Sequence, residues 1–387
     1  MEAKCMEDLS KFRQAIDNID DNIIRLLKER MDVATAIADY KLEHNQSITD
    51  KAREQQKLNT LEKKALSYEL MPSYIHDLYT LIMKYTCAKE QHDILSKLNH
   101  KPQSRDTSVA YLGTKGSYSH VAATKFFEGF LGKIEAFGCE NFEQIVGNVE
   151  THNCEFGVLP VENSSSGSIN EVLDILQTTK STIVGEQFLQ IDHSILGIKN
   201  ISLNNITDVY SHPQPLAQCS QWLHNMLPHV RIHYTKATSE AMETVKQKQD
   251  PSHVAIASRL AASFFDLVPL FDNISNNPHN LTRFIIISMT PTLVPLNVKA
   301  KTSLGFSVKK YTPGSLIKVL SEIYKHNLNL SKIISRPKIE NTKETWEEIF
   351  FADLDGNANT EDFLKLLEDL KSLTSSLKVL GCYPSNE

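Results

Sequence analysis

One stretch of the chain combines a hydroxyl, a guanidinium and an aromatic ring, Asn280-Leu281-Thr282-Arg283-Phe284. It stands directly before Ile285-Ile286-Ile287, a pattern that predicts a buried strand after a polar loop. A hydroxyl can position or relay a proton, and a guanidinium can bind a carboxylate through its planar fork. A Thr-Arg pair alone is also typical of a solvated strand end, so the surrounding sequence has to decide between the two.

A second set of chemical groups lies on the apolar stripe of a long predicted helix, which runs from Leu9 to about Leu42. Arg30 and Lys41 are separated by about 1100° of helical rotation, so they point in directions within ~20° of each other. Buried cations need anionic partners, so this pair predicts a site for acidic groups. Arg13 points about 100° away from Arg30 and would serve a different pocket.

Two further helices are predicted to position these cations, at about 50–65 and 72–98. The second helix carries an i, i+3, i+4 set, and the third carries an i, i+4 pair. Such groups are also typical of surface ion pairs. Because the first helix is much longer than a small domain, we expect it to pack against a second copy of itself. The groups are Asp50, Arg53 and Glu54 on the second helix, and Thr86 and Glu90 on the third.

This arrangement resembles the all-helical chorismate mutases, intertwined dimers that bind chorismate, a dianion, between helices of both subunits. The resemblance implies that Arg30, with Arg13 of the partner chain, binds the carboxylates and that Lys41 donates to the ether oxygen. The reaction is a unimolecular rearrangement that needs no nucleophile and no cofactor, only positioning and charge stabilisation. By the same resemblance, the ring and its hydroxyl are positioned by Asp50, Arg53, Glu54 and Thr86.

One position departs from the bacterial mutase pattern, which has Gln where this chain has Glu90. An amide donates a hydrogen bond to the ether oxygen at any pH, whereas a carboxyl donates only when it is protonated. We therefore expect Glu90 to be a catalytic group, and we expect the mutase activity of the protein to rise toward acidic pH. A weakened mutase beside an intact second activity is the alternative.

The composition excludes several classes of protein. A length of 387 residues suggests two or three domains, and 41% hydrophobic with 23% charged residues is ordinary for a globular protein. The net charge of −6, with no basic segment, argues against nucleic-acid binding. No window suits a membrane helix and the first residues lack a secretion signal, so a cytoplasmic protein is expected. The dispersed cysteines are expected to be reduced, and no metal is predicted, since no fourth ligand accompanies His224, His229 and His233.

After a polar linker at 97–107, apolar strands alternate with helices. Each strand leads into a Ser, Thr or Gly cluster at the start of a helix, the α/β arrangement in which ligands collect at the carboxyl ends of strands. Each cluster alone is also ordinary turn chemistry. Together they resemble prephenate dehydratase in four motifs: Gly-x-Lys-Gly-Ser-Tyr-Ser-His at 113–120, Pro-Val-Glu-Asn-Ser-Ser-Ser-Gly at 160–167, Ser-His-Pro-Gln-Pro at 211–215 and Asn-x-Thr-Arg-Phe at 280–284.

That resemblance implies two lobes, each a small mixed sheet with helices as in periplasmic binding proteins, and a cleft between them. It also implies that the product of the helical domain, prephenate, is converted here to phenylpyruvate. Thr282 would be the essential catalytic group and Arg283 would bind a carboxylate. His120 and His212 are candidates for the proton donor because histidine titrates near neutrality. The cleft would further be lined by Glu162, Asn163, Ser211 and Gln218.

The C-terminal segment has the predicted order βαββαβ, a ferredoxin-like layout. Its strands are expected at 302–308, 330–335, 346–354 and 377–381, and its helices at about 314–326 and 360–374. It resembles an ACT domain, the module through which phenylalanine inhibits such enzymes, and its phenylalanine site would comprise Gly314, Ser315, Leu316, Ser335, Arg336 and Pro337. This chain has Ile334 and Ser315 where that family has Glu and Ala, and Ile cannot accept a hydrogen bond from an ammonium group. Weakened inhibition by phenylalanine is therefore expected.

The whole pattern resembles the bifunctional chorismate mutase/prephenate dehydratases of bacteria, an isomerase and a lyase of phenylalanine biosynthesis in one chain. The predicted organisation is an all-α dimeric mutase at 1–96, an α/β dehydratase at 108–290 and an α+β ACT domain at 302–387, with linkers at 97–107 and 291–301. A non-catalytic ligand-binding sensor with a helical dimerisation arm is the rival interpretation. Thr282 and the cations on the first helix argue against it, since a sensor would not need them.

Overall fold

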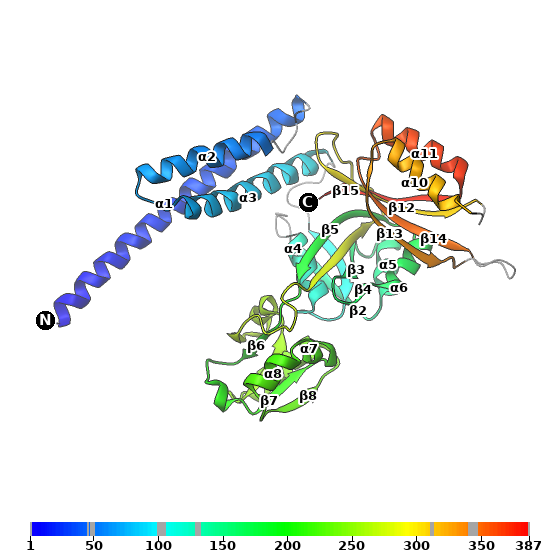
Figure 1. The fold of residues 1–387 in the computed structure, drawn as a ribbon. Coiled ribbons are helices and arrows are strands. Elements are labelled where there is room, and N and C mark those ends of the chain that lie inside the picture. Colours follow the sequence, from blue (N-terminus) through cyan, green and yellow to red (C-terminus); the bar gives the residue numbers. More distant parts are fainter. Residues whose placement is uncertain are drawn as a thin grey trace. The chain divides into compact units, whose positions relative to one another are not determined.

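The computed structural model describes residues 2–44, 46, 51–98, 106–127, 133–309, 313–339 and 347–385. The chain divides into two compact units (Figure 1). The first comprises residues 1–102 and 295–298, and the second comprises residues 103–294 and 299–387. Among the described residues, no helix combines the length and the apolar character that crossing a membrane requires.

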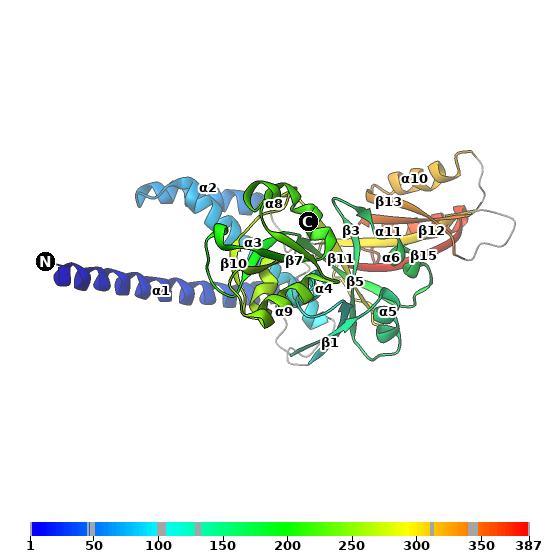
Figure 2. The ribbon, with the colours of Figure 1, turned by 90° about the horizontal axis from the view of Figure 1, so that it is seen from below.

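The first unit consists of three helices, α1 (Glu2–Glu43), α2 (Lys51–Ser67) and α3 (Pro72–Leu98), which confirms the predicted helices. At 1.5 Å per residue α1 is ~63 Å long, and its N-terminal half extends past α2 and α3 (Figures 1 and 2). Only the C-terminal half of α1 packs against α3, where Ala34 and Ala38 are buried. Residues 11–26 of α1 are all exposed within the chain.

The second unit begins with a six-stranded mixed sheet, called here the first sheet, in the order β2-β1-β3-β11-β5 with β4 paired to β3. The neighbours β3 and β5 both run antiparallel to β11, the strand that carries Thr282. Because β11 lies between two partners, its apolar residues 284–287 are buried on both faces. The strands are β1 (Thr107–Leu112), β2 (Ile134–Cys139), β3 (Phe156–Asn163), β4 (Gly167–Ser168), β5 (Thr182–Gln190) and β11 (Leu281–Ser288), and the helices between them are α4 (Tyr118–Phe126), α5 (Phe142–Glu150) and α6 (Asn170–Thr178).

The chain then forms a second sheet, in the order β10-β6-β9-β7-β8, before β11 returns to the first sheet. The two sheets confirm the prediction of two small mixed α/β layers. The strands are β6 (Ser194–Gly197), β7 (Asp208–Ser211), β8 (Arg231–Tyr234), β9 (His253–Ala257) and β10 (Val268–Phe271). The helices are α7 (Pro213–Gln218), α8 (Ser220–Met226) and α9 (Thr238–Lys248), with short 3₁₀ turns η1 (Leu203–Asn205) and η2 (Arg259–Phe265).

The C-terminal sheet is antiparallel throughout, in the order β13-β14-β12-β15. Its elements confirm the βαββαβ prediction, although β12 begins two residues before the expected start. One face packs on α10 and α11, and the other shares a hydrophobic core with the first sheet, in which Phe351 and Leu380 lie with Leu159 and Ile285. The elements are β12 (Ala300–Val308), α10 (Ser315–Lys325), β13 (Asn329–Pro337), β14 (Glu348–Asp355), α11 (Glu361–Leu373) and β15 (Thr374–Pro384).

Candidate functional site

The helical unit contains a cavity of about 540 Å³ between its three helices. Six of the eight residues predicted for the mutase site line it, namely Arg30, Lys41, Arg53, Glu54, Thr86 and Glu90. Lys57, Gln46 and Cys87 line it as well and were missed by the sequence analysis. Four of the lining side chains are cationic and two are carboxylates, so the cavity carries a formal excess of two positive charges, which suits a dianion.

Ionic and hydrogen-bonding contacts hold the groups of this cavity in place. Nζ of Lys41 lies 2.6 Å from Oε2 of Glu90, whose side chain is nearly fully buried. The Arg30 guanidinium donates to Oγ1 of Thr86, which in turn donates to the carbonyl of Ile82 at 2.7 Å. Burial raises the pKa of the neighbouring Cys87 thiol, with the carboxylate of Glu54 acting in the same direction, so this thiol stays protonated. Arg30 and Lys41, which their helical spacing places on one face of α1, thus each contact a residue of α3.

The other two residues predicted for the mutase site are Asp50 and Arg13. Asp50 lies outside the described residues. Arg13 lies on the N-terminal half of α1, where its side chain is exposed. It stands beside an apolar stripe of Phe12, Ile16, Ile19 and Ile23, whose members are 49% to 68% exposed within the chain.

In the second unit, Thr282 and Asn163 form the centre of the predicted dehydratase site. Nδ2 of Asn163 donates to Oγ1 of Thr282 at 2.8 Å and to Oδ1 of Asn280 at 2.7 Å. Oδ1 of Asn163 accepts from the backbone N–H groups of Ser165 and Ser166, which fixes the orientation of the amide. The Thr282 oxygen thus accepts a hydrogen bond, and within the described chain its own hydrogen has no protein acceptor. That hydrogen is available to a ligand.

The predicted loops of the two sheets meet through polar and aromatic contacts. His193 is 1% exposed and lies between Tyr118, the first residue of α4, with Oη 2.8 Å from Nδ1, and Gln218 of α7, with Oε1 2.7 Å from Nε2. Burial lowers the pKa of His193, so this histidine is neutral near pH 7. The Gln218 carbonyl then accepts from Nε2–H, and the hydrogen of the Tyr118 hydroxyl is shared between Nδ1 and the carbonyl of Asp192, which lies 3.0 Å from Oη. Sequence reasoning missed His193, which no motif marked.

Three residues predicted to line the cleft point elsewhere. Ser211 is fully buried in the second sheet and donates to the carbonyl of Ile256 at 2.6 Å. Glu162 forms an ion pair with Lys332 of β13. Arg283 donates from all three of its nitrogens to protein groups on the side of the C-terminal sheet. Successive side chains of a strand face opposite ways, so Arg283 and Glu162 cannot share the face of Thr282 and Asn163.

The two histidines considered as proton donors differ in their surroundings. His120 is nearly buried, with its ring against Tyr111 and Phe264. Burial, and then the charge of Lys115, lower the pKa of His120, so it is neutral at pH 7 and poorly suited to give up a proton. His212 is the N-cap of α7, where its Nδ1 accepts from the N–H of Gln214.

The residues predicted for the phenylalanine site lie in two places of the C-terminal module. Gly314 has a φ of 85°, a left-handed conformation that favours glycine, and it caps α10, which starts with Ser315 and Leu316. On β13, Ser335 is exposed and Arg336 binds Asp174 of α6 through two hydrogen bonds of 2.9 and 2.6 Å. The carbonyl of Pro337 accepts from Gln177, also on α6. Ile334 packs against the core shared with the first sheet.

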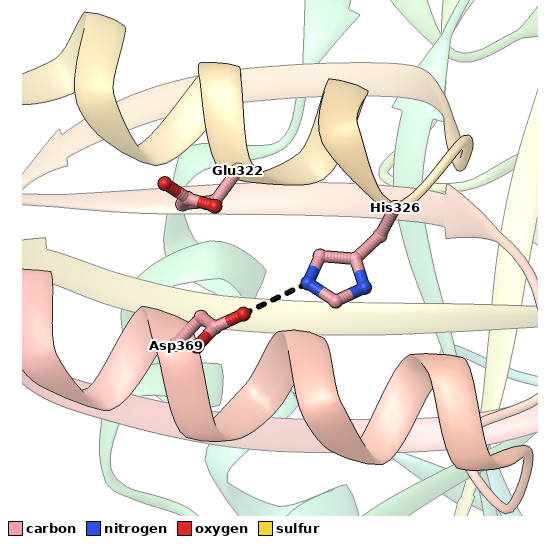
Figure 3. Close-up of side chains that lie close together, drawn as sticks. All are labelled: Glu322, His326 and Asp369. Carbon is pink, nitrogen blue, oxygen red and sulfur yellow. Dashed lines mark hydrogen bonds and ion pairs between the residues drawn. The ribbon is translucent and has the colours of Figure 1, made fainter.

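One group of side chains among the described residues has the spacing of a metal site, Glu322 and His326 of α10 with Asp369 of α11 (Figure 3). His326 lies 2.9 Å from Oδ2 of Asp369, and Glu322 pairs with Lys325. These partners account for the cluster as a set of surface ion pairs between two helices. The three histidines considered in the sequence, His224, His229 and His233, do not form such a group among the described residues. His229 bonds to the carbonyl of Ile206, and His233 bonds to Asp208.

Comparisons with known protein families cover most of the chain. The family model described as chorismate mutase type II matches residues 12–91, and the model described as prephenate dehydratase matches residues 109–292. Relatives named bifunctional chorismate mutase/prephenate dehydratase are similar over almost their whole length. That of Buchnera aphidicola subsp. Acyrthosiphon pisum is 38% identical over 97% of this chain and 96% of the relative, and that of Escherichia coli K12 is 37% identical over the same shares.

Solved structures are similar to the second unit. The prephenate dehydratase of Staphylococcus aureus Mu50 is 27% identical with a TM-score of 0.60, covering 71% of this chain and 99% of that one. The prephenate dehydratase of Arthrobacter aurescens in complex with L-Phe is 24% identical with a TM-score of 0.63, covering 72% of this chain and 90% of that one. At this level of identity, the similarity is evidence of a shared fold only. A chain described as a quorum quenching acylase, GqqA, is 28% identical with a TM-score of 0.62, covering 72% and 98%.

Proposed function

Because the chain belongs to the bifunctional chorismate mutase/prephenate dehydratase family, we propose that its two reactions are divided between the helical cavity and the Thr282 site. The chain converts chorismate to prephenate, and prephenate to phenylpyruvate, CO₂ and water, in phenylalanine biosynthesis. The observation that supports this division is the contrast between a cavity with excess positive charge and a neutral hydroxyl site.

In the helical cavity, Arg30 with Arg13 of the partner chain binds the carboxylates of chorismate, Arg53 helps to position the ring, and Lys41 donates to the ether oxygen as negative charge grows there. Such a fixed donor stabilises the transition state more than the ground state. Glu54 and Thr86 position the ring. Lys41 forms an ion pair with Glu90, so binding of chorismate requires Lys41 to exchange this partner for the ether oxygen.

We place the mutase in a cytoplasmic homodimer. The stripe of Phe12, Ile16, Ile19 and Ile23 occupies one side of α1 and is exposed within the chain. Apolar surface of that extent favours burial against a partner of the same shape. A second α1 in this place would also bring its Arg13 toward a cavity that one chain leaves without it.

At the dehydratase site, Thr282 donates a hydrogen bond to the ring hydroxyl of prephenate, and it positions this group or relays to it the proton with which it leaves as water. The amide of Asn163 supports this role because it donates to Oγ1 of Thr282, which leaves the Thr282 hydrogen free to point at substrate. Departure of the hydroxyl with the loss of CO₂ makes the ring aromatic, so the protein has to orient the leaving group more than supply driving force. Gln218 lines this site through its contact with His193.

The C-terminal module is an ACT domain that binds phenylalanine weakly. Its ferredoxin-like topology and the Gly314 turn support the domain type. Against tight binding stand Ile334, which packs on the core shared with the first sheet, and Arg336, which Asp174 already binds. Both side chains instead make contacts between the C-terminal module and the first sheet with its helix α6.

Two substitutions test the division between the sites. Lys41→Met should lower the mutase rate by about 10² to 10³, the usual effect of losing one transition-state donor, and leave dehydration of added prephenate unchanged. Thr282→Val should lower the dehydratase rate by about 10² to 10⁴ and leave chorismate consumption unchanged. The matched controls are Lys63→Met, at an exposed position of α2, and Thr244→Val, at a half-buried position of α9. Loss of both activities from either single substitution would contradict the division.

A further inference from the structure

Four charged side chains lie between the first sheet and the C-terminal sheet, three of them buried and Asp353 partly buried, and neither reaction uses them directly. Arg283 of β11 and Glu186 of β5 come from the first sheet, and Lys301 of β12 and Asp353 of β14 come from the C-terminal sheet. Glu186 is fully buried, and Lys301 and Arg283 are 3% and 7% exposed. These four residues are called the charge cluster below.

Arg283 is the centre of the charge cluster. Its Nε donates to Oε2 of Glu186 at 2.8 Å and its Nη1 donates to Oδ2 of Asp353 at 2.6 Å. Its Nη2 donates to Oη of Tyr383 at 2.9 Å, and Nζ of Lys301 donates to Glu186 at 3.0 Å. Two cations oppose two carboxylates, so removing the charge of one member leaves a net charge in this largely buried cluster, which is unfavourable.

The position of Arg283 next to Thr282 connects this cluster to the dehydratase site. Thr282 faces Asn163, and Arg283 extends to the other side, into the C-terminal sheet. Directly after Arg283 the pairing of β11 with β3 becomes irregular, because Val161 is an extra residue of β3, whereas the pairing with β5 is regular there. Such bulges re-aim neighbouring side chains. The anchoring of Arg283 therefore helps to set the direction of the Thr282 hydroxyl.

We propose that Asp353 and Glu186 are positioning residues for the dehydratase reaction, which hold Arg283 and thereby aim Thr282 at the leaving hydroxyl. The C-terminal module thus supplies a group, Asp353, that the catalytic strand needs even when no effector is bound. This inference rests on the proposed role of Thr282 and adds the requirement that the module contributes to the geometry of the site.

The test uses Asp353→Asn in the full-length chain, with Asp355→Asn as the matched control on the same strand. Asp355 is exposed and accepts a hydrogen bond only from Asn329 among the described groups. A displacement of about 1 Å costs about 10²-fold in rate, so we expect Asp353→Asn to lower the dehydratase kcat by ~10- to 100-fold. KM should change less than kcat, because the lost alignment concerns the leaving group more than binding. Mutase kcat, measured on the same sample, should be unchanged, as should both activities of the control.

A second variant covers the case in which Asp353→Asn does not fold. Tyr383→Phe removes one hydrogen bond to Arg283 and keeps all four charges, and it should lower kcat a few-fold. Asp353→Glu, which restores the charge, should recover part of the activity. A folded Asp353→Asn protein with the wild-type kcat, or with a change in KM alone, would overturn the proposal. Full dehydratase activity in Thr282→Val would instead refute the role of Thr282, so the two failures are distinguishable.

Discussion

The helical cavity and the Thr282 site differ in whether charged side chains face the site. In the cavity, four cations and two carboxylates face an open volume of about 540 Å³. At the Thr282 site the neighbouring charges, Glu162 and Arg283, turn to the C-terminal sheet and pair there, which leaves a hydroxyl and amides on the site's side. A dianion that rearranges needs fixed charges around it, whereas a hydroxyl that leaves as water needs a well-aimed donor.

The difference also concerns what completes each site. The helical cavity lacks Arg13, which lies on an exposed part of α1 with a bare apolar stripe. The Thr282 site is completed inside the chain, by a neighbouring module whose Asp353 binds Arg283. The mutase is therefore expected to depend on a second copy, and the dehydratase on the C-terminal sheet of its own chain. The predictions below test this contrast in order of decreasing effect.

The largest effect is expected from breaking the apolar stripe of α1. Ile16→Glu places a charge in the proposed dimer interface and should give monomers with a mutase rate at least about 10²-fold lower, since each missing transition-state contact costs that much. Dehydration of prephenate should continue. Gln14→Glu adds the same charge about 200° from Phe12 on the helix and serves as the control. Light scattering after size exclusion gives the mass, and a dimeric, fully active Ile16→Glu protein would contradict the interface.

A medium effect is expected from replacing Glu90. In the wild type the carboxyl can donate to the ether oxygen only when protonated, so the mutase rate should rise as the pH falls from 8 to 5. Glu90→Gln donates at every pH, so its profile should be flat and its rate at pH 8 should exceed the wild-type rate about tenfold. This is less than the 10²- to 10³-fold that a lost donor usually costs, because Lys41 still donates to the same oxygen. Initial rates of chorismate loss over a pH series measure this. A flat wild-type profile would exclude Glu90 as the donor.

A smaller effect is expected from phenylalanine. With Ile334 packed in the shared core and Arg336 bound to Asp174, we expect a Kd for phenylalanine above about 1 mM, equivalent to a binding free energy weaker than about −4 kcal/mol. Calorimetry on the full-length chain, with the dehydratase rate measured in parallel, checks this value. Micromolar binding accompanied by strong inhibition would show that the module retains a working effector site.

The smallest effect is expected from His193. Burial lowers its pKa in the folded state, so protonation favours the unfolded chain. The stability of the second unit should therefore be complete above the ordinary histidine pKa and decline as the pH falls through the lowered one. His193→Gln should make this decline shallower. The pH dependence of stability can be measured by thermal unfolding between pH 8 and 5, followed by tryptophan fluorescence with Trp222 in the core of the second sheet as a reporter. If stability depends on pH equally in the wild type and in His193→Gln, His193 is not the cause of the decline.

The helical unit was largely predictable from its sequence. A period of 3.6 residues determines which side chains share a face, so Arg30 and Lys41 could be placed together, and α2 and α3 added Arg53, Glu54, Thr86 and Glu90. The length of α1 likewise indicated an incomplete surface. Hydrophobic patterning could not reveal Lys57 or Cys87, whose contribution depends on how the helices cross.

In the second unit the motifs located Thr282 and Asn163, but the roles of their neighbours did not follow from proximity in sequence. The alternation of side chains along β3 and β11 should have separated Glu162 and Arg283 from the site. Their partners, Lys332 and Asp353, come from a module about 70 residues or more away along the chain, and sequence periodicity does not report such pairings. The contact of His193 with Gln218 likewise joins residues that are distant in the sequence, so periodicity does not predict it.

The most direct test of two separate sites in one chain is complementation between Lys41→Met and Thr282→Val. Each purified variant is given chorismate at neutral pH, alone and mixed with the other, and the formation of phenylpyruvate is followed. Neither variant alone should form it at an appreciable rate, and the mixture should, because the Thr282→Val chain supplies prephenate to the intact dehydratase of the Lys41→Met chain. Phenylpyruvate from one variant alone at the wild-type rate, or none from the mixture, would contradict this account.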